Sequence, residues 1–300
     1  MMSADEEEEA DEACCVSCGI TQVDEIKLKI CTACKSVRYC SVECQKKHRS
    51  QHKRACKKRA AELRDKILFR QPESSHLGDC PICCLPLFID PSKSTLMPCC
   101  TKMICMGCEN ANFVREVEES LGHRCPFCRE SRTFTREEVE MNLMNRIEAN
   151  DPVAISEVGK DRYCEADYNG AFDYWTKAAG LGNIDAHYEL SMMYRNGQGV
   201  ERDIKKAIYH WEQAAIGGHP IARHHLGAIE WGNGRREWAL KHWIISAKLG
   251  HDDALEMLKK VYKAGLVSKE DFAAALRAHQ TAVDATKSPQ REAADRQNRG

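Results

Sequence analysis

The sequence predicts small metal-stabilised modules followed by an all-α helical repeat array. Two observations carry this fold class. Seventeen of the 18 cysteines lie between Cys14 and Cys128, and a segment rich in tryptophan and alanine recurs three times after residue 170. Free thiols at this density are typical of metal sites in a reducing compartment, whereas disulfide scaffolds belong to secreted proteins. We therefore expect metal modules in the first half of the chain and stacked helices in the second.

Composition divides the chain into seven segments. They are an acidic tail (1–13), a first cysteine block (14–56), a basic helical linker (57–79), a second cysteine block (80–129), a linker helix (130–159), the repeats (160–285) and a polar tail (286–300). Both tails are expected to be disordered because they have little apolar surface to bury. The linker helix should begin with a capping box, Thr135 with Glu138, and end before Asp151 and Pro152.

The hydropathy, the N-terminal sequence and the net charge favour an intracellular protein. No apolar run approaches the roughly 18 residues that cross a bilayer, and the acidic start lacks the positive and apolar pattern of a secretory signal. A net charge of -1 gives no overall bias toward nucleic acid or membrane. We expect a cytoplasmic or nuclear location and no membrane partner.

The first cysteine block carries four pairs of zinc-type ligands. Two residues between thiols allow both sulfurs to reach one tetrahedral ion at about 2.3 Å. Eight ligands predict two closed sites that fold the segment, with no open position for catalysis. The pairs are Cys15 and Cys18, Cys31 and Cys34, Cys40 and Cys44, and His52 and Cys56.

Residues 15–56 resemble the MYND zinc finger, most clearly in the sequence pattern YCS..CQ......HK..C from Tyr39 to Cys56. The resemblance implies interleaved pairs: Cys15, Cys18, Cys40 and Cys44 for one ion, and Cys31, Cys34, His52 and Cys56 for the other. It also implies a surface that binds short proline-containing peptides. The chain departs from the family at Arg49, where a tryptophan is usual.

The second block resembles a RING finger, with CPIC at its start and CPFCR at its end. The resemblance implies one ion held by Cys80, Cys83, Cys105 and Cys108, and another held by the second and fourth pairs. In PCCTKMIC (98–105), Lys102 stands where the family has a histidine, and a protonated lysine has no lone pair for zinc. We expect Cys99 and Cys100 to bind with Cys125 and Cys128. The alternative is a three-thiol site completed by water or His123. About four zinc ions are expected in all, two per finger.

The RING resemblance also implies a partner. Such fingers recruit a charged ubiquitin-conjugating enzyme and form no covalent intermediate, so no catalytic residue is expected. Ile82, Pro126 and Arg129 match the family's partner-binding positions, and ENANFVREVEESL would supply the flanking helix. The leading hypothesis is a ubiquitin ligase whose substrate protein is held by the first finger or the repeats. The alternative is a non-enzymatic scaffold or adaptor.

The repeat region is organised around Trp175, Trp211 and Trp243, which are 36 and 32 residues apart. Its sequence pattern W..AA..G...A resembles the Sel-one-like class of helical repeats. This resemblance implies stacked helix pairs with a peptide-binding or adaptor surface. The histidines in this region occupy different positions within their repeats, so we expect their side chains to pack against neighbours or face solvent and not to bind a metal.

A basic run lies between the two blocks, with eight lysines and arginines within residues 45–59. A solvated helix face is expected here and nucleic acid is not an expected partner, because no aromatic residues are interleaved for base stacking.

Overall fold

The computed structural model describes residues 13–22, 27–131 and 135–297. The chain forms two units, residues 1–70 and 71–300, and each is described by itself. All but the last residue of the predicted acidic tail lies outside the described residues. In the part of the chain that the structure describes, no helix is both long and apolar enough to cross a membrane.

The first unit is built on a short antiparallel ladder and one long helix. Strands β1 (Lys29–Ile30) and β2 (Arg38–Tyr39) pair with Lys29 opposite Tyr39. Helix α1 (Val42–Leu68) begins after Ser41, whose side chain accepts a hydrogen bond from the Cys44 amide at 3.2 Å. The helix passes through the predicted boundary at residue 57 without a break, so the basic stretch to Leu68 continues a helix of the finger.

The second unit begins with a hairpin and a helix. A 3₁₀ turn, η1 (Pro91–Lys93), leads into β3 (Ser94–Met97), β4 (Lys102–Cys105) and α2 (Met106–Glu118). Thr95 lies opposite Ile104 in the hairpin. Its apolar core is small: Leu87, Met97 and Ile104 pack among cysteine side chains. So few apolar contacts make the fold of this segment dependent on its thiols.

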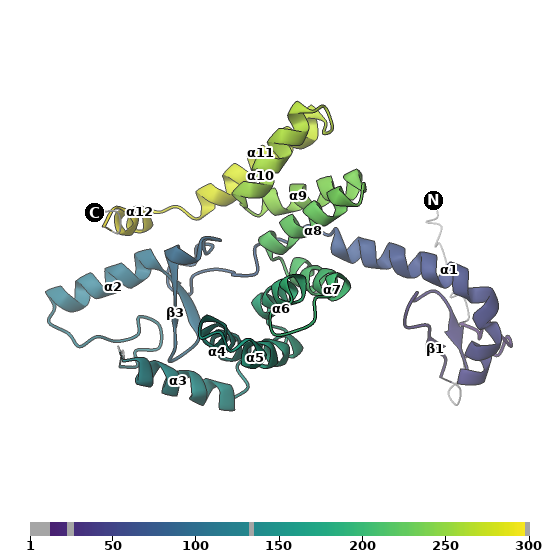
Figure 1. Cartoon of the computed structure of the whole chain (residues 1–300), viewed down its shortest axis with the longest axis horizontal. Coiled ribbons are helices and arrows are strands. Elements are labelled where there is room, and N and C mark those ends of the chain that lie inside the picture. The colour runs from purple at the N-terminus through teal and green to yellow at the C-terminus, as the bar shows by residue number, and fades with distance from the viewer. Residues whose placement is uncertain (1–12, 23–26, 132–134, 298–300) are drawn as a thin grey trace, which may run out of the picture. The chain divides into compact units, whose positions relative to one another are not determined.

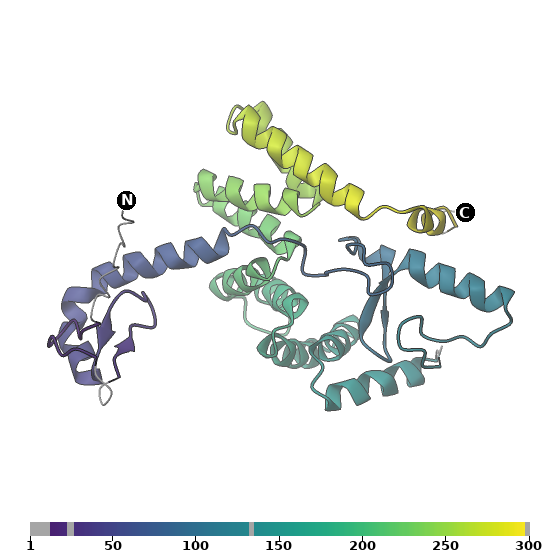
Figure 2. The ribbon, with the colours of Figure 1, turned by 180° about the vertical axis from the view of Figure 1, so that it is seen from behind.

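Antiparallel helix pairs form the rest of this unit (Figures 1 and 2). Helix α4 packs on α5, α6 on α7, and α8 on α9, which confirms the predicted helical repeat class. The helices are α3 (Arg136–Glu148), α4 (Pro152–Cys164), α5 (Tyr168–Gly180), α6 (Ile184–Asn196), α7 (Ile204–Ile216), α8 (Pro220–Gly232), α9 (Arg236–Lys248), α10 (Asp252–Lys263), α11 (Lys269–Ala285) and α12 (Pro289–Gln297).

The three repeat tryptophans are buried in equivalent places, on α5, α7 and α9. The indole of Trp175 donates to the Ser156 carbonyl at 3.0 Å, and that of Trp243 donates to the His224 carbonyl at 3.3 Å. Sixteen residues before each of these two tryptophans stands a glycine, Gly159 or Gly227, and a Cβ there would meet the indole ring. These glycines allow the indole to reach the carbonyl of the preceding helix.

The middle repeat departs from this pattern. Sixteen residues before Trp211 stands Arg195, whose guanidinium lies 5.9 Å from the Trp211 ring centroid. The Trp211 indole nitrogen is buried with no hydrogen-bond partner among the described residues. A cation over the ring thus takes the place of the close glycine contact, and the indole hydrogen bond is lost.

Two boundaries differ from those predicted. Helix α4 begins at Pro152, and its Ile155 belongs to the core around Trp175, so the array starts before residue 160. Residues 289–297 form α12 where the sequence predicts a disordered tail. The tail has few apolar residues, but it buries Arg291 and Ala294 against the rest of this unit. The capping box at Thr135 and Glu138 forms as predicted.

Replacing Gly227 with alanine should destabilise the array. The added Cβ would lie well inside van der Waals contact of the Trp243 indole nitrogen. We expect a loss of about 1–3 kcal/mol in the free energy of unfolding, measured by urea denaturation. Gly232→Ala in the same helix meets nothing within 4 Å and should be neutral or slightly stabilising. Equal effects of the two changes would contradict the close-packing argument.

Candidate zinc centres

The structure brings together all four predicted ligand groups. In each group the donor atoms lie within 4.8 Å of one another. The first unit holds Cys15, Cys18, Cys40 and Cys44 in one group and Cys31, Cys34, His52 and Cys56 in another; the second unit holds Cys80, Cys83, Cys105 and Cys108, and Cys99, Cys100, Cys125 and Cys128. Each group takes one pair from an early and one from a later part of its finger, which is the interleaved order implied by the resemblances.

The spacing of the donor atoms fits zinc. Thiolates at about 2.3 Å from a tetrahedral ion stand about 3.8 Å from one another. The sulfurs of Cys31 and Cys56 are 3.8 Å apart, as are those of Cys83 and Cys105. All of these cysteines are free thiols, and a disulfide would need sulfurs about 2.05 Å apart. The residues present therefore form tetrahedral zinc sites that fold the chain around the ion.

One backbone turn delivers half of the ligand pairs. In four of the C-x2-C pairs, the residue after the second cysteine has a left-handed backbone, and its amide donates to the carbonyl of the first cysteine. We call this turn with its two cysteines a knuckle. The left-handed residues are Gly19 (φ 75°), Lys35 (φ 56°), Cys84 (φ 53°) and Arg129 (φ 64°). The turn aims both sulfurs at the same point. Only the first of the four uses glycine, so the other three bear a small conformational cost.

Helix α1 supplies three of the four remaining ligands of the first unit, and the fourth, Cys40, lies between β2 and the helix. Cys44, His52 and Cys56 recur at intervals of four or eight residues and therefore share one face of the helix. His52 is fixed by a ring stack on His48 (centroids 5.6 Å apart), and His48 Nδ1 lies 3.1 Å from the hydroxyl of buried Tyr39. This packing orients the one imidazole ligand toward the Cys34 sulfur, 3.3 Å away.

The adjacent pair Cys99 and Cys100 reaches one point because it lies in the β3–β4 turn. The amides of Cys100 and Thr101 both point to the Met97 carbonyl, at 3.3 and 2.7 Å, and Thr101 has a left-handed backbone (φ 54°). The Cys99 sulfur is then 3.4 Å from that of Cys128, and the Cys100 sulfur is 3.9 Å from that of Cys125. The structure thus favours Cys99 as the fourth ligand.

His123, the alternative to Cys99 as the fourth ligand, contacts a carboxylate and lies outside the donor group. Its Nδ1 lies 3.2 Å from a carboxylate oxygen of buried Glu116, and its ring stacks on Phe113. Burial raises the pKa of Glu116, but the Arg124 amide, Asn112 and His123 outweigh it and leave the pKa below its usual range. The histidine therefore ties α2 to the segment that leads into Cys125.

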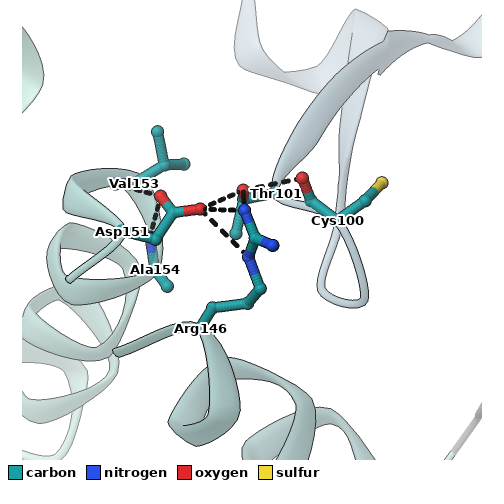
Figure 3. A network of polar contacts seen from close by, with 6 residues as sticks. All are labelled: Cys100, Thr101, Arg146, Asp151, Val153 and Ala154. Atoms are coloured by element: carbon teal, nitrogen blue, oxygen red, sulfur yellow. Dashed lines mark hydrogen bonds and ion pairs between the residues drawn. The ribbon is translucent and has the colours of Figure 1, made fainter. Parts of the chain in front are cut away.

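A polar network supports the Cys99–Cys100 turn from the start of the array (Figure 3). Thr101 donates to the Asp151 carboxylate at 2.6 Å, and Arg146 donates to the same oxygen at 2.6 Å. The other oxygen of Asp151 accepts from the Val153 and Ala154 amides and caps α4. One carboxylate thus joins the zinc-site turn, the end of α3 and the beginning of α4.

The thiols of one group cannot all ionise without a cation. Burial raises the pKa of Cys15, but amide donors, chiefly that of Cys40, outweigh it and lower the pKa to about 6. Hydrogen bonds with the Cys18 and Cys44 thiols raise the pKa of Cys40 to about 12. A divalent ion removes this conflict by neutralising neighbouring thiolates.

A further donor cluster, His76, Asp185 and His219, lies between the segment after α1 and the repeats. His76 Nε2 is 2.8 Å from the Asp185 carboxylate, and its ring stacks on His219 at 4.2 Å. His219 Nδ1 accepts the Ala222 amide as the cap of α8, so its proton sits on Nε2. That nitrogen has no lone pair for a metal, and the cluster is a packing contact. No sequence pattern predicts this cluster, because its three residues are far apart in the chain.

The predicted partner-binding residues differ in exposure. Ile82 is 41% exposed, and Arg129 is exposed with its guanidinium 3.4 Å from the Asn112 side chain. Pro126 is buried, so the placement of its ring does not support the predicted direct contact, and the neighbouring Phe127 is exposed instead. The segment predicted to flank the groove is helical in α2, as expected.

Comparison with known proteins assigns two of the three regions. Residues 15–56 match the MYND finger family, and residues 155–183 and 184–219 match the Sel1 repeat. The chain carries a MYND finger and Sel1 repeats. It is therefore a zinc-binding protein of the protein-interaction class, since both modules mediate protein contacts.

The similar proteins each match only part of this chain. A stretch of 72 residues, 24% of this chain, is 29% identical to the DAP3-binding cell death enhancer 1 of Rattus norvegicus, and the chain spans 14% of that protein's length. A Sel1 repeat protein from Oxalobacter formigenes is 23% identical over 61% of this chain and 72% of its own (TM-score 0.44). The antigen c5321 of uropathogenic Escherichia coli, with an SLR fold, is 26% identical over 49% of this chain and 33% of its own (TM-score 0.41).

Changing Cys99 to serine should lower the zinc content of the purified chain by one ion, because serine is a poor ligand for zinc. Metal analysis against protein concentration measures this. Cys84→Ser is the matched control, since Cys84 stands beside a ligand in the other site but lies outside the donor groups. An unchanged zinc content in the Cys99 variant would favour the three-thiol alternative.

Asp151→Ala should destabilise the second unit by about 2 kcal/mol or more, because it removes both a helix cap and a charged network. Asp203→Ala is the control: Asp203 caps α7 through the Lys205 and Lys206 amides in the same way. Chemical denaturation compares the two. If both changes cost the same free energy, the contacts to Thr101 and Arg146 contribute nothing.

Proposed function

We propose that this protein is a RING-type ubiquitin ligase that recruits a ubiquitin-conjugating enzyme through residues 80–129 and presents a substrate protein held by the Sel1 repeats or the MYND finger. The observation that carries the proposal is an exposed apolar surface beside both donor groups of the second finger. Ile82 lies inside the first knuckle of this finger and Phe127 inside the last, and both are more than two-fifths exposed.

Helix α2 extends the same type of surface. Its ligand Cys108 is buried, while Phe113, Val114 and Val117 further along are exposed. Apolar side chains left in solvent on a small zinc module favour a protein partner, because nothing within such a small core can cover them. Arg129 adds a guanidinium that can donate to a partner's carbonyl or carboxylate groups.

The zinc ions have a structural part in this function. When bound, each supplies a fixed four-coordinate centre and leaves no open position for a substrate. The chain's own residues do the rest: Ile82 and Phe127 offer apolar contacts to the conjugating enzyme, and Arg129 would restrain the ubiquitin it carries. The transfer itself then passes from the partner's thioester to a substrate lysine.

The proposal is tested by ubiquitin-chain formation with purified activating enzyme, a panel of conjugating enzymes, ubiquitin and the full chain. Ile82→Ala should reduce chain formation about ten-fold, as expected for a central interface residue worth more than 1 kcal/mol. Leu276→Ala in α11 is the control, because Leu276 is equally exposed, at 41%. The zinc content of both variants should equal that of the wild type.

Arg129→Asn separates ubiquitin restraint from binding. Asparagine tolerates the left-handed backbone of this position better than alanine does, so the knuckle should survive. We expect slower discharge of ubiquitin from the charged enzyme and unchanged binding of the uncharged enzyme. If no member of the panel forms chains with the wild-type protein, the non-enzymatic scaffold is the better description.

A further inference from the structure

The C-terminal helix α12 lies against α2 of the RING-like finger (Figures 1 and 2). Three side-chain contacts attach it along its length: Gln290 to the Gly107 carbonyl at 3.0 Å, Lys93 to Asp295 at 3.0 Å, and Asn110 to Gln297 at 2.6 Å. The backbone approaches closely as well, since a Cβ on Gly107 would lie 2.9 Å from the Arg291 Cα. Glycine at 107 is therefore what allows α12 to sit here.

Arg291 enters the finger at the first donor group and is only 3% exposed. Its Nη1 donates to the carbonyls of Pro86 and Thr286 at 2.7 and 2.9 Å. Its Nη2 donates to the Leu85 carbonyl at 3.1 Å and to the Cys83 sulfur at 3.2 Å. The guanidinium thus holds both the backbone of the knuckle and one of its ligand atoms.

A buried guanidinium needs a compensating negative charge. Four thiolates around one divalent zinc leave a net charge of about -2 on the site, and Arg291 is in hydrogen-bond contact with it. The same contact draws electron density from the Cys83 sulfur, which makes that sulfur less reactive toward protons and electrophiles. Hydrogen bonds of this type around a metal site typically change affinity by about 10- to 100-fold.

We propose that α12 is an integral part of this zinc site, and that Arg291 donates a hydrogen bond to the zinc-bound thiolate of Cys83 and slows the loss of that ion. Arg291 acts as a positioning residue and not as a ligand. A C-terminal segment whose Arg291 is 208 residues from Cys83 in sequence then controls how firmly the finger holds metal. This proposal does not depend on ubiquitin transfer.

Zinc release from the full chain into a chromogenic chelator tests the proposal. In Arg291→Gln, one ion should leave about 10- to 100-fold faster than in the wild type, and the rates of the others should stay the same. Arg296→Gln in the same helix is the matched control, because Arg296 is exposed and the change removes an identical charge. Equal release from Arg291→Gln and wild type would overturn the proposal.

Cobalt substitution separates the thiolate hydrogen bond from helix packing. Losing a donor to the Cys83 sulfur should move the sulfur-to-cobalt charge-transfer band to lower energy in Arg291→Gln. Arg291→Lys keeps the charge but loses the planar fork, and its release rate should fall between the two. Faster release with an unmoved cobalt band would overturn the assigned hydrogen bond.

Gly107→Ala provides an independent route, because its Cβ should displace α12 while leaving Arg291 in the chain. It should release the same single ion faster. If it does not, α12 does not contribute to the site.

Discussion

The fold of both fingers depends on four donor atoms meeting at one point. A tetrahedral zinc ion requires sulfurs about 3.8 Å apart, and this requirement decides the backbone around every ligand pair. Three of the four knuckles accept a left-handed residue that is not glycine, namely Lys35, Cys84 and Arg129. The apolar core of the second finger is only a few residues, so coordination replaces the packing that a larger domain would use.

This dependence explains why two adjacent cysteines, Cys99 and Cys100, can serve as a ligand pair. A ligand pair needs two sulfurs aimed at one point, and a tight hairpin turn can supply that from adjacent residues. The Met97 carbonyl and the left-handed Thr101 set the turn, and Asp151 holds Thr101 from outside. The support comes from the helical region, so the unusual ligand pair is stabilised by residues that lie beyond the finger.

Local patterns predicted most of the fold and the ligand groups, because zinc spacing, helix caps and repeated tryptophans are all read within short windows. The spaced ligand pairs, the capping box at Thr135 and the stacked helix pairs follow from such patterns. The grouping of the pairs comes from the family resemblances, and Cys99 is expected as a ligand with a three-thiol site as the alternative. Helix α12 could not be predicted in this way. Its main buried residue, Arg291, is stabilised by carbonyls and a thiol of residues 83–86, and no signal in the tail itself reveals those partners. Pro126 was predicted to bind a partner from its place in the motif, but its ring is buried. A position in a motif therefore does not determine whether a side chain is exposed.

Within the second unit, the finger is held at both of its zinc sites by residues outside it. Asp151, at the first helix of the array, supports the turn of one site, and Arg291, beyond the last helix of the array, contacts the other. A finger attached at two separated points has little freedom to rotate against the helices that hold it. A protein bound to the repeats would then face the exposed surface around Ile82 in a fixed geometry. Fixed presentation reduces the entropic cost of bringing two partners together, and a finger tethered to the repeats by a flexible linker would not have this advantage.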